Sequence, residues 1–482
     1  MTDESGADPI LLDGTALSCA QVAAVAAGAS ARLAPAGRIR AWRSWRAANH
    51  AAARTAVYGR TTGVGANRHQ QIRSDRPDAA RAVLRSHATS AGPLRSPGRI
   101  RALLAIRLNQ LAAGGSGVSP PVLDAWEAML ASNALPPVRE CGSVGTGDLT
   151  ALATVALTLA GELPATRPLP AVEIGPSDGL ALLSSNAATL ADVALAWTEL
   201  DEGLRAAVGV AALSVVALRG NPEAFGETAL GATPFPGARR VASGLRALLA
   251  GTDRSPARLQ DPFALRTLPQ VLGSALEALE RARSVTNTLM NVAAENPLLL
   301  ADGSVTHHGG FQASYLQAAL DGAKLAVATA GTCVLARLGA LSEPGLTGLA
   351  AFLTDGTPGA SGVMACEYVA ASALGDIRAA AHPAGLQTVV LSRGVEEDAS
   401  FASLAATDLL RIADRWPILL GCELVAAVRA LRMGPDGCGP PMAALLERCA
   451  GLPAGLTDRD LTGDLDVARS LLPALADAVH GN

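Results

Sequence analysis

Hydrophobic residues recur at helical spacing over most of the chain beyond residue 99. In the stretch RIRALLAIRLNQLAAG the apolar positions from Ile100 to Leu111 broadly follow one helical period, and Gly114 and Gly115 end it. The same pattern predicts helices over residues 149–160, 180–218, 265–293, 311–341, 362–374, 400–432 and 464–479, separated by loops rich in glycine and proline. Long antiparallel helices with short connections pack as a bundle, so we expect a long central helical bundle.

The first hundred residues have a different texture. They combine short helical stretches with glycine and arginine clusters, and the loop between Tyr58 and Pro77 is rich in both glycine and charge. We therefore expect a smaller N-terminal domain over residues 1–105 that carries the Tyr58 loop. Residues 106–482 are expected to form the long-helix bundle, which would also be the oligomerisation core.

Composition supports a mainly α fold and a small-molecule partner. Hydrophobic residues make up 49% of the 482 residues, but aromatic residues only 3%, which favours helices packed through alanine and leucine. The 39 basic and 43 acidic residues give a net charge of −4, with no long run of either sign. This balance gives no electrostatic support for a nucleic-acid partner or an anionic membrane.

Neither export, a membrane nor a metal is indicated. The N-terminal MTDESGADPILLDGT lacks a basic and then apolar leader, and the apolar runs are too short or too often interrupted by polar residues to span a bilayer. We expect a cytoplasmic protein. The seven cysteines are scattered and contain no CxxC pair, so we interpret them as small buried hydrophobic residues, with neither disulfides nor a zinc site.

Several loop motifs occur in an order that is typical of one enzyme family. They are LLDGTALSCAQVAAVA (11–26), VYGRTTGVG (57–65), SHATSAGPL (86–94), GSVGTGDLTALA (142–153), GLALL (179–183), QDPFALRTLPQVLG (260–273), ENPLLL (295–300), GGF (309–311), SGVMA (361–365), AHPA (381–384) and EED (396–398). Through these motifs the chain resembles the aromatic amino acid ammonia-lyase family, and histidine ammonia-lyase in particular.

The resemblance implies a fold, an assembly and a reaction. The fold is the mainly α ammonia-lyase/fumarase-like architecture, and the assembly is a homotetramer whose active sites are built from more than one subunit. The family removes an α-amino group and a β-proton from histidine, phenylalanine or tyrosine. A base contributes only about 10²–10⁴ in rate, so the family adds an electrophile, a methylidene-imidazolone made by cyclisation of an Ala-Ser-Gly tripeptide.

Three residues match the family's catalytic base and its carboxylate-binding segment, and a fourth departs from it. Tyr58 stands where the family keeps its catalytic tyrosine, on a loop that closes over the site, so the resemblance implies a general base there. Arg266 matches the arginine that binds the substrate carboxylate, and Gln260 is matched as well. Phe263 departs from the family, because a tyrosine stands there whose hydroxyl phenylalanine cannot replace.

Two further positions bear on the pocket. His87 falls at a side-chain selectivity position that is histidine in histidine ammonia-lyase, where it would bind a polar substrate tail; the alternative is a structural histidine. At Ser184 the family has an asparagine that helps to hold the prosthetic group and the substrate amine. Asn186 is a possible substitute, although helical geometry would place it on another face.

The resemblance also covers two later loops. Gly310 replaces a family asparagine, Phe311 is retained, and Gln312 matches the phenylalanine-type enzymes. Glu397 matches the acidic residue near the substrate amine. If the carboxylates of residues 396–398 were buried together they would raise one another's pKa and offer an acid or base; the alternative is a solvated acidic turn.

The turn at residues 142–149 is one residue shorter than the family's Gly-Ser-Val-Gly-Ala-Ser-Gly-Asp-Leu. If Gly145 is the glycine before the triad, only Thr146 and Gly147 remain, and the family's five-membered ring has no way to close. If Gly145 replaces the alanine, Gly145-Thr146-Gly147 is a formal triad that could give an ethylidene-imidazolone. We favour the first placement, in which no prosthetic group forms, and expect Asp148 to cap the following helix.

Three hypotheses follow. The first is a lyase-like enzyme without the usual electrophile. It would catalyse elimination, conjugate addition or cyclisation on a small, amino-acid-derived carboxylate, in specialised metabolism, with Tyr58 as acid or base. The second is an ammonia-lyase or aminomutase with an electrophile derived from Gly145-Thr146-Gly147. The third is a catalytically inactive homologue that only binds a ligand.

Overall fold

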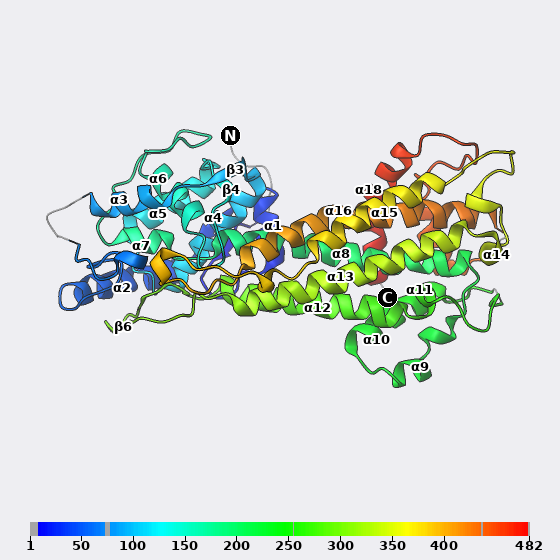
Figure 1. Cartoon of the computed structure of the whole chain (residues 1–482), viewed down its shortest axis with the longest axis horizontal. Coiled ribbons are helices and arrows are strands. Elements are labelled where there is room, and N and C mark those ends of the chain that lie inside the picture. The colour runs from blue at the N-terminus through cyan, green and yellow to red at the C-terminus, as the bar shows by residue number, and fades with distance from the viewer. Residues whose placement is uncertain (1–7, 73–77, 254, 435–436, 481–482) are drawn as a thin grey trace. The chain divides into compact units, whose positions relative to one another are not determined.

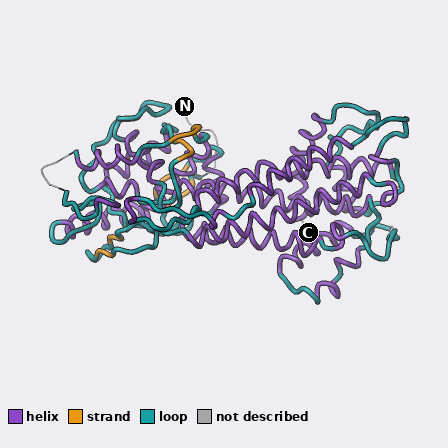
Figure 2. Tube along the Cα trace, in the orientation of Figure 1, coloured by secondary structure: helices purple, strands orange, loops and turns teal. Residues whose placement is uncertain are grey.

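The computed structural model describes residues 8–72, 78–253, 255–434 and 437–480, and its regular structure is almost entirely helical (Figure 2). The mainly α fold predicted from the sequence is confirmed. The chain forms two compact units, each assembled from distant segments. Unit 1 comprises residues 1–198, 283–320 and 383–407, and unit 2 comprises residues 199–282, 321–382 and 408–482.

Unit 1 contains most of the short elements (Figure 1). Its α-helices are α1 (Cys19–Ala26), α2 (Pro35–Ala52), α3 (Ala79–His87), α4 (Pro97–Ala113), α5 (Pro120–Ser132), α6 (Leu149–Leu159) and α7 (Asp178–Leu183). Short 3-10 turns are η1 (Gly65–Asn67), η4 (Ala384–Leu386) and η5 (Ser392–Gly394). The strands pair two by two: β1 (Ile10–Leu12) with β2 (Ala31–Leu33) in parallel, and, antiparallel, β3 (Ala91–Leu94) with β4 (Arg139–Cys141) and β5 (Leu298–Leu299) with β6 (Val305–Thr306).

The regular structure of unit 2, over its described residues, consists of helices. These are α9 (Glu227–Gly231), α10 (Pro236–Leu249), α11 (Phe263–Arg266), α14 (Pro344–Thr347), α15 (Met364–Ala380), α17 (Pro440–Arg448) and α18 (Thr462–His480), with the 3-10 turns η2 (Pro222–Phe225) and η3 (Ala351–Leu353). Four long helices contribute residues to both units: α8 (Ala187–Ala217), α12 (Leu268–Met290), α13 (Ser314–Ser342) and α16 (Ala402–Met433). The domain boundary expected after residue 105 falls inside α4, within unit 1.

Each predicted long helix is present, and the main difference concerns residues 180–218. The sequence predicts one helix there, but the backbone leaves helical geometry after α7, and Ser184 has φ −82° and ψ 86°. Helix α8 then begins at Ala187. Hydrophobic periodicity continues through this break, which is why the pattern alone did not reveal it.

Helix α4 is the core of unit 1 and is buried on all sides rather than on one face. It packs against α1, α2 and α5. Its polar residues Arg107, Asn109 and Gln110 are buried together with its leucines. Buried polar side chains need internal partners, so these residues mark a polar network inside an apolar helix.

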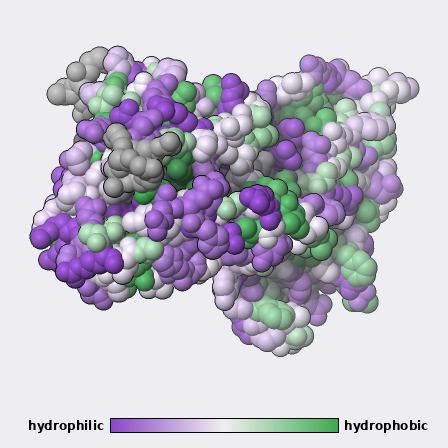
Figure 3. Space-filling model, turned by 60° about the vertical axis from the view of Figure 1, so that its left-hand side comes forward, coloured by the Kyte–Doolittle hydropathy of each residue, from purple (hydrophilic) through white to green (hydrophobic). Residues whose placement is uncertain are grey.

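Two helical stretches are long and apolar enough to cross a membrane by length and composition, Asp178–Ala217 and Ser314–Ser342. Of their most apolar windows, 78% and 56% are buried inside the structure, as in core helices of globular proteins. On the face of the molecule drawn in Figure 3, hydrophilic and hydrophobic residues are interspersed.

The cysteines only partly match the prediction that they are small buried hydrophobic residues. All seven are free thiols, and Cys19, Cys366, Cys422 and Cys449 are buried as expected. Cys141 is exposed, because it lies on the short strand β4 at the surface of unit 1.

Candidate active site

The short turn at residues 142–148 is held by the segment that enters α16. Gly145 is buried and has φ +93°. The Ser400 hydroxyl donates a hydrogen bond of 2.9 Å to the Gly145 carbonyl, and the Phe401 amide donates one of 2.9 Å to the Val144 carbonyl. A Cβ atom on Gly145 would lie 2.3 Å from the Ser400 hydroxyl oxygen and 2.8 Å from the Phe401 amide nitrogen. This position therefore accepts only glycine.

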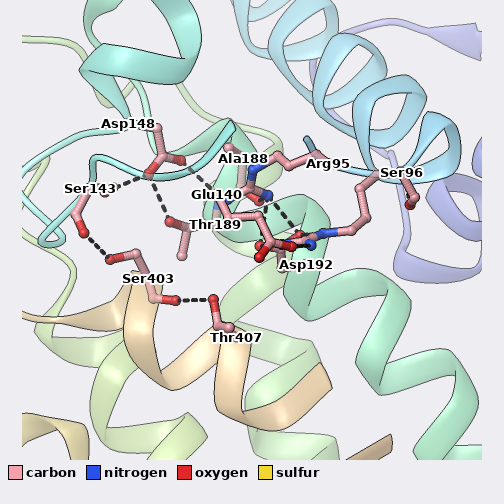
Figure 4. Close-up of polar contacts among 11 residues, drawn as sticks. Arg95, Ser96, Glu140, Ser143, Asp148, Ala188, Thr189, Asp192, Ser403 and Thr407 are labelled. Carbon is pink, nitrogen blue, oxygen red and sulfur yellow. Dashed lines mark hydrogen bonds and ion pairs between the residues drawn. The ribbon is translucent and has the colours of Figure 1, made fainter. Parts of the chain in front are cut away.

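Asp148 fixes the end of the turn, but not as the helix cap that the sequence predicts. Its carboxylate accepts hydrogen bonds from the Ser143 hydroxyl (2.8 Å) and from the Thr189 amide and hydroxyl (both 2.8 Å) (Figure 4). Its side chain makes no capping bond to α6. Burial raises the pKa of the Asp148 carboxyl, and these hydrogen bonds act against the rise. The carboxylate therefore joins the turn to the start of α8.

A second buried carboxylate, Asp192, lies on α8 about one helical turn after Thr189. Asp192 pairs with Arg95 (2.8 Å) and with Arg99 (2.8 Å), and Arg99 also pairs with Glu140 (Figure 4). This cluster fixes strand β4 and the start of α4 to α8. The turn at residues 142–148 thus begins and ends on parts of the chain that are anchored independently.

Tyr58 lines a small pocket inside unit 1. The pocket has room for about one water-sized group, about 10 Å³, and its lining includes Tyr58, Arg60, Ser184 and Glu295. The Gly65 amide donates a 2.7 Å hydrogen bond to the Tyr58 hydroxyl oxygen. That bond uses the phenol as an acceptor and leaves its proton to be donated. Burial lowers the pKa of the Arg60 guanidinium to about 10, and the charge of Asp178 acts in the opposite direction.

Glu295 contributes a buried carboxylate to this pocket, a role that the sequence motifs do not indicate. It is only 3% exposed, and its Oε1 accepts a 2.8 Å hydrogen bond from Arg107 of α4. Its Oε2 is buried and has no hydrogen-bond partner. Burial raises the pKa of the Glu295 carboxyl, while the charges of Arg107 and His308 act against the rise. The signal that could have identified it is the arginine inside the apolar stretch of α4, which requires an internal anion.

Ser184 lies in this pocket, whereas Asn186 has another role. The Asn296 amide donates to the Ser184 hydroxyl at 3.4 Å. Asn186 lies in the break between α7 and α8. Helical spacing from Ser184 therefore does not determine the direction of its side chain. Its amide group donates a 3.0 Å hydrogen bond to the Phe311 carbonyl, and its Oδ1 is buried without a partner.

The loop that carries the carboxylates of residues 396–398 lies against the Tyr58 loop. The contact is made by Glu396 rather than by Glu397. The Glu396 Oε1 accepts a 2.6 Å hydrogen bond from Ser392 and would lie 3.8 Å from a Cβ on Gly65. Glu397 and Asp398 are exposed in the single chain, so the three carboxylates are not buried together. Asp398 accepts a 2.8 Å hydrogen bond from the Gln312 side chain.

Three histidines of unit 1, His87, His307 and His308, make local hydrogen bonds. The His87 Nδ1 lies 2.8 Å from the Val83 carbonyl at the end of α3, which assigns the Nδ1 proton and leaves Nε2 as an acceptor. His307 accepts the Tyr58 amide at 3.4 Å, and the Nδ1 of His308 accepts the Gly310 amide at 2.9 Å. Within the described ranges, three or more potential ligands of a metal ion do not gather anywhere.

The carboxylate-binding candidates lie in unit 2. The Arg266 guanidinium carbon stacks 4.6 Å from the centroid of the Phe263 ring, so the phenylalanine supports the arginine by a cation–π contact. Arg266 Nε is buried without a partner, and no carboxylate of the described residues forms an ion pair with this guanidinium. Phe263 is 69% exposed, and Gln260 is exposed.

The predicted site residues therefore fall into two groups. Unit 1 contains Tyr58, His87, Gly145, Thr146, Gly147, Ser184, Phe311, Gln312 and Glu397, and unit 2 contains Gln260, Phe263 and Arg266. Arg107, Glu295 and Ser400 have roles that the sequence motifs do not indicate. The first two form a buried ion pair, and the third holds the short turn.

Comparison with known proteins identifies the family. The sequence model of the aromatic amino acid lyase family matches residues 17–450. The histidine ammonia-lyase of Geobacillus kaustophilus is 32% identical over 439 residues, which cover 86% of this chain and 87% of that protein.

Solved structures agree with this match. The tyrosine aminomutase of Streptomyces globisporus superposes with a TM-score of 0.91 at 27% identity, over 98% of both chains. The histidine ammonia-lyase of Trypanosoma cruzi superposes with a TM-score of 0.89 at 26% identity, over 98% of this chain and 95% of that chain. The protein with the short 142–148 turn therefore belongs to the aromatic amino acid lyase family.

Proposed function

We propose that the protein is a lyase-like enzyme that works without the methylidene-imidazolone of its relatives. It would catalyse an elimination, a conjugate addition or a ring closure on a small, amino-acid-derived molecule that carries a carboxylate. Such reactions require a substrate with an acidified proton or a good leaving group, because no covalent electrophile helps to remove ammonia. A role in specialised metabolism and a cytoplasmic location belong to this proposal.

The observation that carries the proposal is the lack of space at Gly145. In relatives the prosthetic group begins with an alanine, yet a Cβ at Gly145 would overlap the Ser400 hydroxyl oxygen at 2.3 Å. This supports the alignment in which Gly145 is the glycine before the triad, so that only Thr146 and Gly147 remain. In that alignment only Thr146 and Gly147 stand where the family has three residues, so the alanine position of the triad is missing. The residues present therefore do not fit the family's group.

Tyr58 is proposed as the acid or base, and Arg266 as the group that binds the carboxylate. Tyr58 lines the pocket, and its phenol oxygen accepts a hydrogen bond from the Gly65 amide, which leaves its own proton to be donated. The Arg266 guanidinium has an open fork for a planar carboxylate. Because Arg266 and Phe263 belong to unit 2 and Phe263 is exposed, we propose that they act across subunits of a homotetramer.

Intact mass tests the missing prosthetic group. We expect the purified chain to have the mass of its unmodified sequence and no imidazolone absorbance in the near ultraviolet. Loss of two water molecules from the chain would contradict this proposal. Tyr58→Phe should abolish turnover of the true substrate, while Tyr315→Phe, at an exposed tyrosine of α13, should leave turnover unchanged.

A second candidate is an ammonia-lyase or aminomutase whose electrophile is made from Gly145-Thr146-Gly147. One observation favours it: Thr146 is half-buried, and its hydroxyl has no hydrogen-bond partner among the described residues, so no contact would have to be broken to dehydrate it. Thr146→Ala separates the two candidates. It should leave activity intact under the main proposal and abolish it under the second.

A further inference from the structure

Glu295 is a buried carboxylate with one satisfied and one unsatisfied oxygen. Arg107 donates to Oε1 at 2.8 Å, while Oε2 is buried without a partner. An ionised carboxylate is an acceptor only, and a buried acceptor without a partner is costly. A molecule that donates a hydrogen bond to Oε2 would remove that cost.

The orientation of this carboxylate is fixed by a network that the catalytic proposal does not use. Arg107 also donates to the Ala181 carbonyl and, at 3.4 Å, to the Gln110 side chain. Gln110 in turn donates to the Leu289 carbonyl (3.0 Å) and accepts from the Ser185 hydroxyl (2.6 Å). The guanidinium is 1% exposed and has no freedom to turn, so Oε1 is held and Oε2 is left for another donor.

The space beside Glu295 suits a small donor. Glu295 is the acidic side chain of this pocket, whose lining also includes Tyr58, Ser184 and Arg60. The Arg60 guanidinium already donates to the Gly117 carbonyl and to the Asn49 side chain. The unpartnered Oε2 of Glu295 therefore suits a protonated amine, which offers three donors and a positive charge to the carboxylate.

We propose that Glu295, positioned by Arg107, binds the ammonium group of the substrate in the Tyr58 pocket. This inference rests on the proposed use of that pocket as the substrate site. It assigns the amine to a buried carboxylate of unit 1, while Glu397 is exposed in the single chain. The substrate would therefore be an amine as well as a carboxylate, and its nitrogen would lie next to the Tyr58 hydroxyl.

The test measures binding of methylammonium chloride to the full-length protein by calorimetry, so it needs neither the true substrate nor turnover. Glu295→Gln retains a carbonyl oxygen for Arg107 but loses the charge, and we expect its affinity for methylammonium to fall by about tenfold or more. Glu423→Gln is the matched control, because it makes the same change at a buried carboxylate that also pairs with an arginine but does not line this pocket. It should bind methylammonium like the wild type.

Equal affinity of the wild type and Glu295→Gln would overturn the inference, as would an equal loss in Glu423→Gln. Thermal unfolding of both variants shows whether they are folded. If Glu295→Gln does not fold, Glu295→Asp replaces it, since its shorter carboxylate keeps the charge but withdraws it from the pocket and should also weaken binding. These outcomes are independent of the intact mass and of the Tyr58→Phe result, so failure here is distinguishable from failure of the proposed function.

Discussion

The Ser400 hydroxyl lies 2.9 Å from the Gly145 carbonyl oxygen and occupies the space that a side chain at residue 145 would need. Gly145 also has φ +93°, a backbone conformation that is costly for other residues. We therefore expect Gly145→Ala to lower the free energy of unfolding by about 3 kcal/mol. Urea denaturation measures this change.

Gly147→Ala is the control in the same turn. Its φ is +137°, but the nearest atom to an added Cβ is 3.5 Å away, so it meets backbone strain without overlap. Its cost should be about 1–2 kcal/mol. Equal costs for the two variants would show that Ser400 does not restrict residue 145.

Asp148 should make the stability of the protein depend on pH. Because burial raises its pKa in the folded chain, the folded state binds the proton more tightly than the unfolded state does. Its contribution to stability is complete below the unfolded pKa of about 3.9 and is lost as the pH rises through the folded pKa. Compared with Asp148→Asn, the wild type should therefore lose free energy of unfolding from about pH 4 upward.

Asp302 provides the opposite case for comparison. Hydrogen bonds from Ser304 lower its pKa, so its contribution is present above the unfolded pKa and is lost as the pH falls through the folded pKa. The difference in free energy of unfolding between the wild type and Asp302→Asn should thus change with pH in the opposite direction to that of Asp148. Chemical denaturation at a series of pH values measures both, and the same sign for both residues would contradict the prediction.

Hydrophobic periodicity predicted the helices and the motifs predicted the family. Neither predicted the contacts that hold the turn at residues 142–148. Periodicity reports burial, and the long helices bury enough residues for that signal to be clear. Ser400 and Gly145 are 255 residues apart, and no local pattern connects them. The same is true of Arg107 and Glu295, since an ion pair becomes visible only when the fold brings its members together.

Phe263 should influence how well Arg266 binds a carboxylate. Its ring supports the guanidinium at 4.6 Å, and the contact is worth about 0.5–1 kcal/mol. Phe263→Leu should weaken the binding of propionate by about two- to fivefold, whereas Phe263→Tyr, which keeps an aromatic face, should bind like the wild type. Binding is measured by titration calorimetry, and unchanged affinity in Phe263→Leu would exclude this supporting role.

The buried pair of Arg337 and Glu423 should contribute to the stability of unit 2. Both side chains are 0% exposed, the arginine donates to both carboxylate oxygens at 2.6 and 2.8 Å, and it also donates to the Ala264 carbonyl of α11. Arg337→Ala leaves the Glu423 charge buried without its arginine, so we expect a loss of about 3–5 kcal/mol in the free energy of unfolding.

The exposed pair of Arg415 and Asp376 is the matched control, since their side chains are 46% and 59% exposed. Arg415→Ala should cost less than about 1 kcal/mol, because solvent screens that pair. Thermal and urea unfolding of both variants provide the comparison. A small effect of Arg337→Ala would show that water or another donor replaces the guanidinium.

The packing at Gly145 also bears on whether the longer turn typical of the family could be built into this chain. Besides the Ser400 hydroxyl, the amide nitrogens of Phe401 and Ala402 would lie 2.8 and 3.0 Å from a Cβ at residue 145. Trimming Ser400 would remove only the first obstacle, since the other two are main chain and no side-chain substitution changes them. Reinserting one residue to rebuild an alanine-initiated triad would therefore require the entry to α16 to move as well. A single inserted residue would not be enough, because the turn and the entry to α16 would have to change together.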